Sequence, residues 1–409
     1  MSREFDLVLF GATGFTGALV AEALARRKGA GLSWALAGRS AQKLAAVRSD
    51  ITGIENSLAE LPLLIADAGD EAALRSIAAR SEVVITTVGP YAKFGLPLAK
   101  ACATEGTDYC DLTGEVPFVR DVIDTCQGAA ERSGARIVPC CGFDSIPSDL
   151  GVFLLHEHFA KTGRSLTRAK MVVGKTKGGF SGGTAASMLN LMELGGRDRE
   201  ARRLMADPYA LIPDRTNDRG PDRGDKIGVE FDRDAKSWTG PFVMAAVNTR
   251  VVRRTNAVLG HPYGRDFRYA EVMGLGSGPA GFARSAGLTA GLGAFVGVAS
   301  AGRLGRSLLS KVLPKPGEGP PREAREAGFF RIRVFGWAGG DRPEAVCHVW
   351  GTSDPGYGET AKMLTETAIL LSETRGTGKG GVWTPASALG SELAVRLRAQ
   401  GMRWDVEEA

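Results

Sequence analysis

The chain has 409 residues, of which 44% are hydrophobic and 24% are charged, and its net charge is +5. This composition is typical of a soluble globular protein that is long enough for two or three domains. The mild, dispersed positive charge and the lack of a basic stripe with interleaved aromatic residues argue against a nucleic-acid partner.

The six cysteines include no C-x-x-C pair, and no Cys/His pair has zinc-ligand spacing, so we expect no metal site. The first residues lack the charged and apolar regions of a signal peptide and enter a strand almost at once. We therefore expect a cytoplasmic protein whose thiols are free.

A strand, a glycine-rich turn and a helix open the chain. Phe5–Phe10 is an apolar run of strand formers, and a helix is expected after the turn. Gly11 permits the turn, Gly14 lets the backbone approach a pyrophosphate, and Gly17 lets the helix pack on the strand. The free N–H groups at the helix start favour an anion, although a turn used only for packing is the alternative. The candidate cofactor-binding residues here are Gly11, Ala12, Thr13, Gly14, Phe15, Thr16 and Gly17.

Residues 1–145 alternate between apolar strands and amphipathic helices, which predicts a Rossmann-type, doubly wound parallel sheet of the α/β class. Ligands of such sheets bind beyond the carboxyl ends of the strands. The expected strands are 5–10, 32–37, 61–65, 83–88, 109–112 and 136–140. The expected helices are 16–28, 41–47, 70–79, 95–105 and 117–133.

The end of the second strand favours NADP(H) over NAD(H). Arg39 and Ser40 stand where an acidic residue would bind the ribose 2′-hydroxyl of NAD, and a guanidinium there suits a 2′-phosphate. Lys43 could add charge one turn later. Asp67 closes the third strand and either meets the adenine edge or caps the helix that begins near Asp70.

Three further loops leave the sheet at the same edge. Val88, Gly89 and Pro90 end the fourth strand, where the nicotinamide ribose should pass, and Tyr91 then follows as a candidate proton donor. Asp111 and Glu115 follow the fifth strand and could order the cofactor loops or cap a helix, the latter being favoured for Glu115. Asp144 follows the sixth strand and is the second candidate proton donor, with a turn cap as the alternative.

The alternation stops after residue 150, and residues 146–354 are expected to form an α+β domain for substrate binding or dimerisation, with one mostly antiparallel sheet. Residues 207–241 are expected to form a mobile loop. The C-terminal segment 355–409 is expected to fold back onto the nucleotide domain. The expected strands of this part are 168–175, 242–252, 267–273, 329–337 and 345–350.

The apolar segment 285–302 carries no charge and is rich in Gly, Ala, Ser and Thr. It could be a buried helix lining an apolar tunnel, an interfacial helix with basic anchors, or a helix–helix dimer face. Each alternative suits a hydrophobic substrate better than a small polar one.

Several motifs together resemble the saccharopine dehydrogenase-like oxidoreductases, and most of all the actinobacterial trans-acting enoyl reductases. They are G-A-T-G-F-T-G, A-G-R-S, V-G-P-Y, D-Y-C-D-L-T-G-E, C-G-F-D-S-I-P-S-D-L-G, S-G-G-T and G-G-V-W-T-P. The resemblance implies NADP(H) as the cofactor and reduction of a carbon–carbon double bond in an acyl or polyketide intermediate bound to a carrier protein or synthase. It also implies an activity in lipid biosynthesis near the inner face of the plasma membrane.

The leading hypothesis is therefore an NADPH-dependent enoyl reductase. One alternative is an imine or amino-acid dehydrogenase of the saccharopine type, and another is a lipid-associated protein that binds a nucleotide without turnover. Peripheral contact with a membrane and a homodimer are further expectations.

Overall fold

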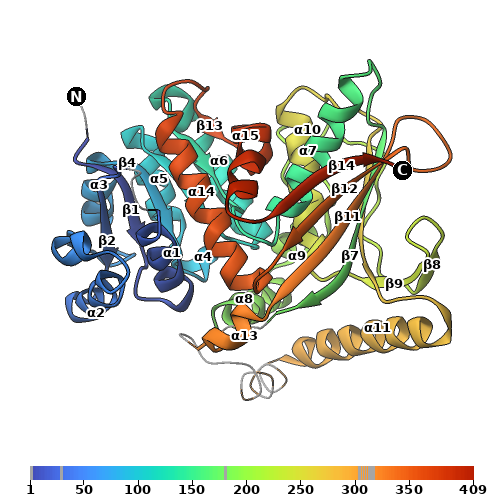
Figure 1. Ribbon diagram of the computed structural model, residues 1–409, viewed down its shortest axis with the longest axis horizontal. Coiled ribbons are helices and arrows are strands. Elements are labelled where there is room, and N and C mark those ends of the chain that lie inside the picture. Colours follow the sequence, from blue (N-terminus) through green and yellow to red (C-terminus); the bar gives the residue numbers. More distant parts are fainter. Residues whose placement is uncertain are drawn as a thin grey trace.

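A computed structural model describes residues 3–27, 31–178, 182–302 and 318–409, with single positions between 303 and 317. It contains two seven-stranded sheets with helices around them (Figure 1). The expected α/β class with a second α+β unit is confirmed. Ser181, the first residue of the S-G-G-T motif, lies outside the described residues.

The first sheet is parallel throughout, in the order β13-β6-β5-β4-β1-β2-β3. Helices cover both of its faces, because apolar side chains of its strands are buried on both sides of the sheet. Its strands are β1 (Phe5–Phe10), β2 (Trp34–Gly38), β3 (Leu63–Ile65), β4 (Ser81–Thr86), β5 (Asp108–Asp111), β6 (Arg136–Val138) and β13 (Gly381–Val382). Its helices are α1 (Phe15–Ala25), α2 (Ala41–Thr52), η1 (Asn56–Glu60), α3 (Glu71–Arg80), α4 (Tyr91–Phe94), α5 (Leu96–Glu105), α6 (Val116–Ser133) and α14 (Thr360–Glu373).

The second sheet is mixed, in the order β14-β12-β11-β7-β10-β9-β8. Only the β7–β10 pair is parallel, so the expectation of a mostly antiparallel sheet holds. Its strands are β7 (Arg168–Lys177), β8 (Glu230–Asp232), β9 (Ser237–Pro241), β10 (Arg268–Gly274), β11 (Phe329–Trp337), β12 (Ala345–Gly351) and β14 (Arg403–Glu408). The other helices are α7 (Ile146–Ala160), α8 (Gly182–Arg197), α9 (Arg199–Ala206), α10 (Ala245–Val258), α11 (Gly278–Ser300), α13 (Arg322–Glu326), η2 (Pro355–Glu359) and α15 (Pro385–Ala399).

The C-terminal segment belongs to both sheets. β13 extends the first sheet beside β6, and α14 packs against α1, β4 and β5. β14 then pairs with β12 in the second sheet. One continuous hydrophobic core therefore runs from Leu7 under the first sheet to Phe330 under the second.

The strand expected at 242–252 is wrong, because this segment forms helix α10. Two buried arginines of α10 form ion pairs with the loop before it: Arg253 contacts Asp222 at 2.7 Å, and Arg250 contacts Asp225. Charged residues on the buried side remove the helical pattern of apolar positions that a sequence would show. The same ion pairs hold part of segment 207–241 against α10, where the sequence suggested a mobile loop.

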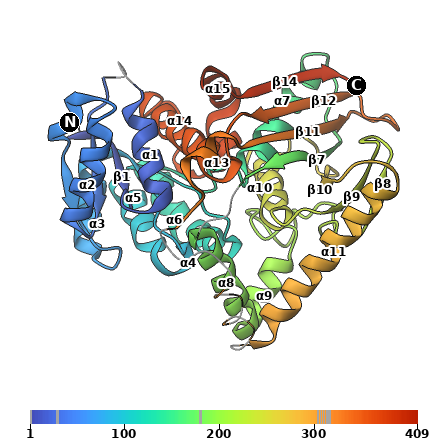
Figure 2. The same ribbon diagram turned by 60° about the horizontal axis from the view of Figure 1, so that its bottom comes forward.

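The apolar segment is also not a buried helix. Most of α11 is exposed, with only Gly281, Ser285 and Ala299 buried, so the tunnel alternative for 285–302 is wrong. Figure 2 shows α11 along the outer edge of the molecule, away from the nucleotide sheet.

Candidate cofactor and catalytic site

The glycine turn has the geometry that a dinucleotide requires. Gly11 has a φ of +91°, where a side chain is strained, and a Cβ on Gly17 would lie 2.1 Å from the carbonyl oxygen of Gly11. Helix α1 can therefore pack on the turn only with glycine at position 17. Gly14 is exposed, and its nearest atom to an added Cβ is 3.4 Å away, so its backbone stays open to a ligand.

The first-turn N–H groups of α1 point out of the helix start with no intrahelical partner. They belong to Phe15, Thr16 and Gly17, while Ala12 and Thr13 form the turn before them. The ring of Phe15 packs edge-on against Tyr357 with the centroids 5.1 Å apart. The start of α1 is thus braced by the segment that leads into α14 and keeps its N–H groups fixed for an anion.

The loop after β4 lies directly beside this turn. Thr87 donates a hydrogen bond to the carbonyl oxygen of Gly11 at 3.1 Å, and a Cβ on Gly11 would lie 2.7 Å from a methyl carbon of Val88. Gly89 is exposed and precedes Pro90 in a cis peptide bond. The structure therefore brings Val88, Gly89 and Pro90 next to the glycine turn. Thr87, the first residue of this loop, is the one that bonds it to the turn.

The ends of β2 and β3 form the neighbouring part of the same edge. Arg39 is exposed where β2 ends, with Lys43 exposed on the first turn of α2. Ser40 caps α2 by accepting a hydrogen bond from the N–H of Lys43 at 3.4 Å, so its hydroxyl already has a structural role. Asp67 accepts from the N–H of Gly69 at 2.9 Å and stays exposed.

Asp70, and not Asp67, caps helix α3, since Asp70 accepts from the N–H of Ala73 at 3.0 Å. The capping alternative for Asp67 is therefore wrong. Asp67 lies at the end of β3, beside β2 and the position of Arg39, where an adenine edge could reach it.

Glu115 joins three elements. Its buried carboxylate accepts hydrogen bonds from the N–H groups of Tyr91 and Ala92, both at 2.9 Å, and from the hydroxyl of Ser187 at 2.8 Å. It thereby caps the short helix α4 instead of its own helix α6 and ties α8 to the loop after β4. Ser187 also lies near Gly89, 3.7 Å from a Cβ placed there. Sequence spacing alone gives no signal for Ser187.

Asp111 fixes the loops after β5 and β6 to each other. Its carboxylate accepts from the N–H groups of Thr113 at 2.9 Å and Cys140 at 3.0 Å, and from the Tyr109 hydroxyl at 2.7 Å. Burial raises the pKa of Asp111 to about 6. Asp111 is therefore a structural residue that shapes the edge of the sheet.

Asp144 lies on the loop after β6 and has no hydrogen-bond partner among the described residues. It is partly exposed, and its carboxylate lies 3.5 Å from a Cβ placed on Gly114. Loss of hydration raises its pKa to about 6. The next residue, Ser145, is buried and bonds to Asn248 of α10 at 3.2 Å, which holds this loop in place.

Tyr91 lies in the core. Its side chain is 4% exposed and packs on Phe118, and its hydroxyl donates to the carbonyl oxygen of Thr86 at 3.1 Å. Burial, with the Asp111 charge, raises its pKa well above the usual range. This placement differs from the expected one near a reactive ring and gives Tyr91 a structural environment.

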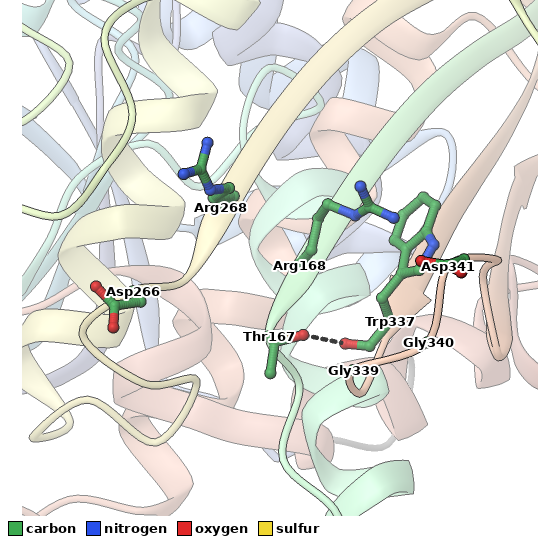
Figure 3. A pocket seen from close by; sticks show the side chains of 8 residues that line it. All are labelled: Thr167, Arg168, Asp266, Arg268, Trp337, Gly339, Gly340 and Asp341. Atoms are coloured by element: carbon green, nitrogen blue, oxygen red, sulfur yellow. Dashed lines mark hydrogen bonds between the residues drawn. The ribbon is translucent and has the colours of Figure 1, made fainter.

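A separate cavity of about 320 Å³ lies at the far end of the second sheet (Figure 3). It lies where β7 and β10 begin, and Arg168 stacks on Trp337 there at 4.0 Å. No residue of the glycine turn lines it, so it is not part of the candidate site. In the described ranges, no group of three or more His, Cys, Asp or Glu side chains could hold a metal ion.

Comparison with known families agrees with this geometry. Residues 7–138 match the model of the saccharopine dehydrogenase NADP binding domain. The match covers the glycine turn, Arg39 and the loops after β4 and β5. The fold and the site therefore define an NADP-binding oxidoreductase.

Relatives that match nearly the whole chain carry a more specific name than the family model does. A Mycobacterium tuberculosis protein that carries the provisional name of trans-acting enoyl reductase is 45% identical over 98% of this chain and 97% of its own. A Mycobacterium ulcerans protein named trans-acting enoyl reductase is 41% identical over the same shares. The apo saccharopine dehydrogenase (L-Glu forming) of Saccharomyces cerevisiae has the same fold, with a TM-score of 0.51, 12% identity, and 99% and 100% of the two chains covered. The chain belongs to the saccharopine dehydrogenase-like oxidoreductases and, within them, to the group of the mycobacterial trans-acting enoyl reductases.

Proposed function

We propose that this protein is an NADPH-dependent enoyl reductase that saturates a carbon–carbon double bond in an acyl or polyketide chain presented as a thioester by a carrier protein or synthase. The observation that carries the proposal is Asp144, a carboxyl group with a raised pKa on the same sheet edge as the glycine turn, which accepts no hydrogen bond from the residues that the structure describes. The names of the full-length relatives support the substrate class.

Each group of residues has one task in this proposal. The turn 11–17 holds the pyrophosphate through backbone N–H groups, and Arg39 holds the 2′-phosphate. Glu115 keeps the loop 88–92 in place beside the turn, and the exposed Asp67 would contact the adenine. NADPH, when bound, supplies the hydride for the β-carbon of the enoyl thioester.

Asp144 would supply the proton for the α-carbon. A donor must hold its proton at the working pH, and a pKa of about 6 lets Asp144 do so in mildly acidic solution. Reduction then adds one hydride and one proton, and the thioester remains intact. Tyr91, the other candidate donor, is less suited because its hydroxyl is committed to the Thr86 carbonyl.

The test is NADPH oxidation by the purified chain against enoyl thioesters, keto acids with amines, and no acceptor. Oxidation with enoyl thioesters alone supports the proposal, while oxidation with keto acid plus amine favours the imine dehydrogenase alternative. NADPH binding without turnover on any acceptor favours the non-enzymatic alternative.

Asp144→Asn separates the donor from the binding residues. We expect a fall in kcat of about 10²-fold or more, with unchanged NADPH affinity. Asp121→Asn, on the exposed side of α6, is the matched control and should keep full turnover. If the wild-type rate falls as pH rises through about 6 and the residual rate of Asp144→Asn does not, the donor role is supported.

A further inference from the structure

Helix α11 is an exposed apolar element on a soluble fold. It has 23 residues, and its most apolar window of 18 residues has a mean hydropathy of 1.3, yet only 11% of that window is buried. By length and composition it is the one helix in the described part of the chain that could cross a membrane. A large exposed apolar surface on a protein marks an interaction site.

The first half of α11 is fixed to the second sheet. Phe282 packs edge-on against Trp238 of β9 with the centroids 5.0 Å apart, and a Cβ on Gly240 would lie 3.4 Å from Leu288. A Cβ on Gly281 would collide with the carbonyl oxygen of Gly276 at 2.0 Å. Crossing a bilayer would break these contacts. We therefore expect α11 to remain packed on the second sheet and to expose its outer side to a partner.

Other exposed apolar side chains gather around this helix. Phe282 is 49% exposed and Val296 is 53% exposed on α11 itself. Phe231 of β8 is 42% exposed and packs edge-on against the same Trp238, with the centroids 5.5 Å apart. The apolar surface thus extends from α11 onto β8, and Figure 2 shows both elements at one edge of the molecule.

The charge of this segment identifies the partner. Residues 272–317 contain five basic residues and no Asp or Glu, and the exposed Arg284 lies on the first half of α11. The other four, Arg303, Arg306, Lys311 and Lys315, follow the helix in the sequence. Apolar side chains with flanking basic residues suit an anionic lipid bilayer, which has a hydrocarbon core beneath negatively charged headgroups.

We propose that α11 and the exposed ring of Phe231 form a docking surface for an anionic lipid bilayer, with α11 lying in the plane of the interface. The apolar side of α11 enters the boundary between headgroups and acyl chains, and Arg284 contacts lipid phosphates. This proposal does not depend on which substrate the protein reduces.

The experiment is flotation of the full chain with vesicles of phosphatidylcholine alone and of phosphatidylcholine mixed with phosphatidylglycerol. We expect binding to the mixed vesicles that weakens with salt, and much weaker binding to phosphatidylcholine alone. Failure of the wild-type chain to float with the mixed vesicles would overturn the proposal.

Two variants locate the surface. Val296→Asp should weaken vesicle binding about tenfold or more, and Arg284→Gln about fivefold. The control is Val395→Asp on α15, where the valine is 51% exposed and far from α11, and it should bind as the wild type does. Equal loss in Val296→Asp and Val395→Asp contradicts the proposal.

The mass of the protein in solution without lipid shows whether a second copy of the chain, and not a bilayer, covers α11. A wild-type dimer that Val296→Asp converts to a monomer would show that another protomer covers α11, and would overturn the proposal. A mass that Val296→Asp leaves unchanged supports the lipid surface.

Discussion

The carboxylate of Glu115, at the start of α6, accepts a hydrogen bond from the hydroxyl of Ser187 on α8 at 2.8 Å. The same carboxylate holds two N–H groups of α4, so one buried charge connects the loop beside the glycine turn with a helix of the second part of the fold. Variants at Glu115 and Ser187 therefore measure how much this contact contributes to the stability of the candidate site.

Glu115→Ala should destabilise the protein by about 1–3 kcal/mol, because it leaves the buried N–H of Tyr91 without an acceptor. Ser187→Ala removes one hydrogen bond and should cost about 0.5–1.5 kcal/mol. Thermal unfolding measures both, with the exposed Glu131→Ala as control. If Glu115→Ala unfolds at no lower a temperature than Ser187→Ala, the hydrogen bonds to α4 contribute nothing to stability.

Two alanine variants separate the structural glycine from the ligand-facing one. Gly17→Ala should lower both Tm and NADPH binding, because its Cβ would lie 2.1 Å from a carbonyl oxygen. Gly14→Ala should keep the wild-type Tm, since its φ of −79° suits alanine, and should still weaken NADPH binding. Calorimetry with NADPH titration decides this, and normal binding by Gly14→Ala would contradict close approach of the pyrophosphate.

Arg39→Ala should weaken NADPH binding about tenfold or more, because a charged hydrogen bond contributes about 1.5–3 kcal/mol. Binding of NADH, which lacks the 2′-phosphate, should change little. Titration of both nucleotides gives the ratio, and Arg132→Ala on α6 serves as an exposed control. Equal weakening of both nucleotides would mean that Arg39 does not contact the 2′-phosphate.

Stability should depend on pH through Asp144. The pKa of about 6 in the folded chain exceeds the usual value of about 4 in an unfolded one, so the native state holds a proton that the unfolded state has released. Wild-type stability from this group therefore falls as pH rises from about 4 to about 6 and stays low above that. Asp144→Asn should be more stable than wild type by about 1–2 kcal/mol at pH 8, with no such gain at pH 4. A gain that is the same at both pH values would contradict the raised pKa.

Tyr91→Phe tests the placement of Tyr91 in the core. Turnover and NADPH affinity should stay within about twofold of wild type, while loss of the bond to the Thr86 carbonyl should cost about 1 kcal/mol. Steady-state kinetics with thermal unfolding measures this. A fall in kcat of about 10²-fold with unchanged NADPH affinity would restore Tyr91 as the proton donor.

The sequence by itself determined the nucleotide-binding half. The strand at 5–10 has the expected bounds, and the glycine turn and Arg39 stand where the pattern placed them, because apolar parallel strands and phosphate turns are encoded in residues that are neighbours along the chain. The tertiary structure decided what depends on distant residues. Helix α10 is buried through arginines that find partners in another loop, Glu115 caps a helix from a different strand end, and α11 lies exposed although its composition also fits a core. The contacts of α10 and of Glu115 join separate elements of the chain, and the exposure of α11 depends on what packs beside it, so none of these features leaves a periodic pattern in the sequence.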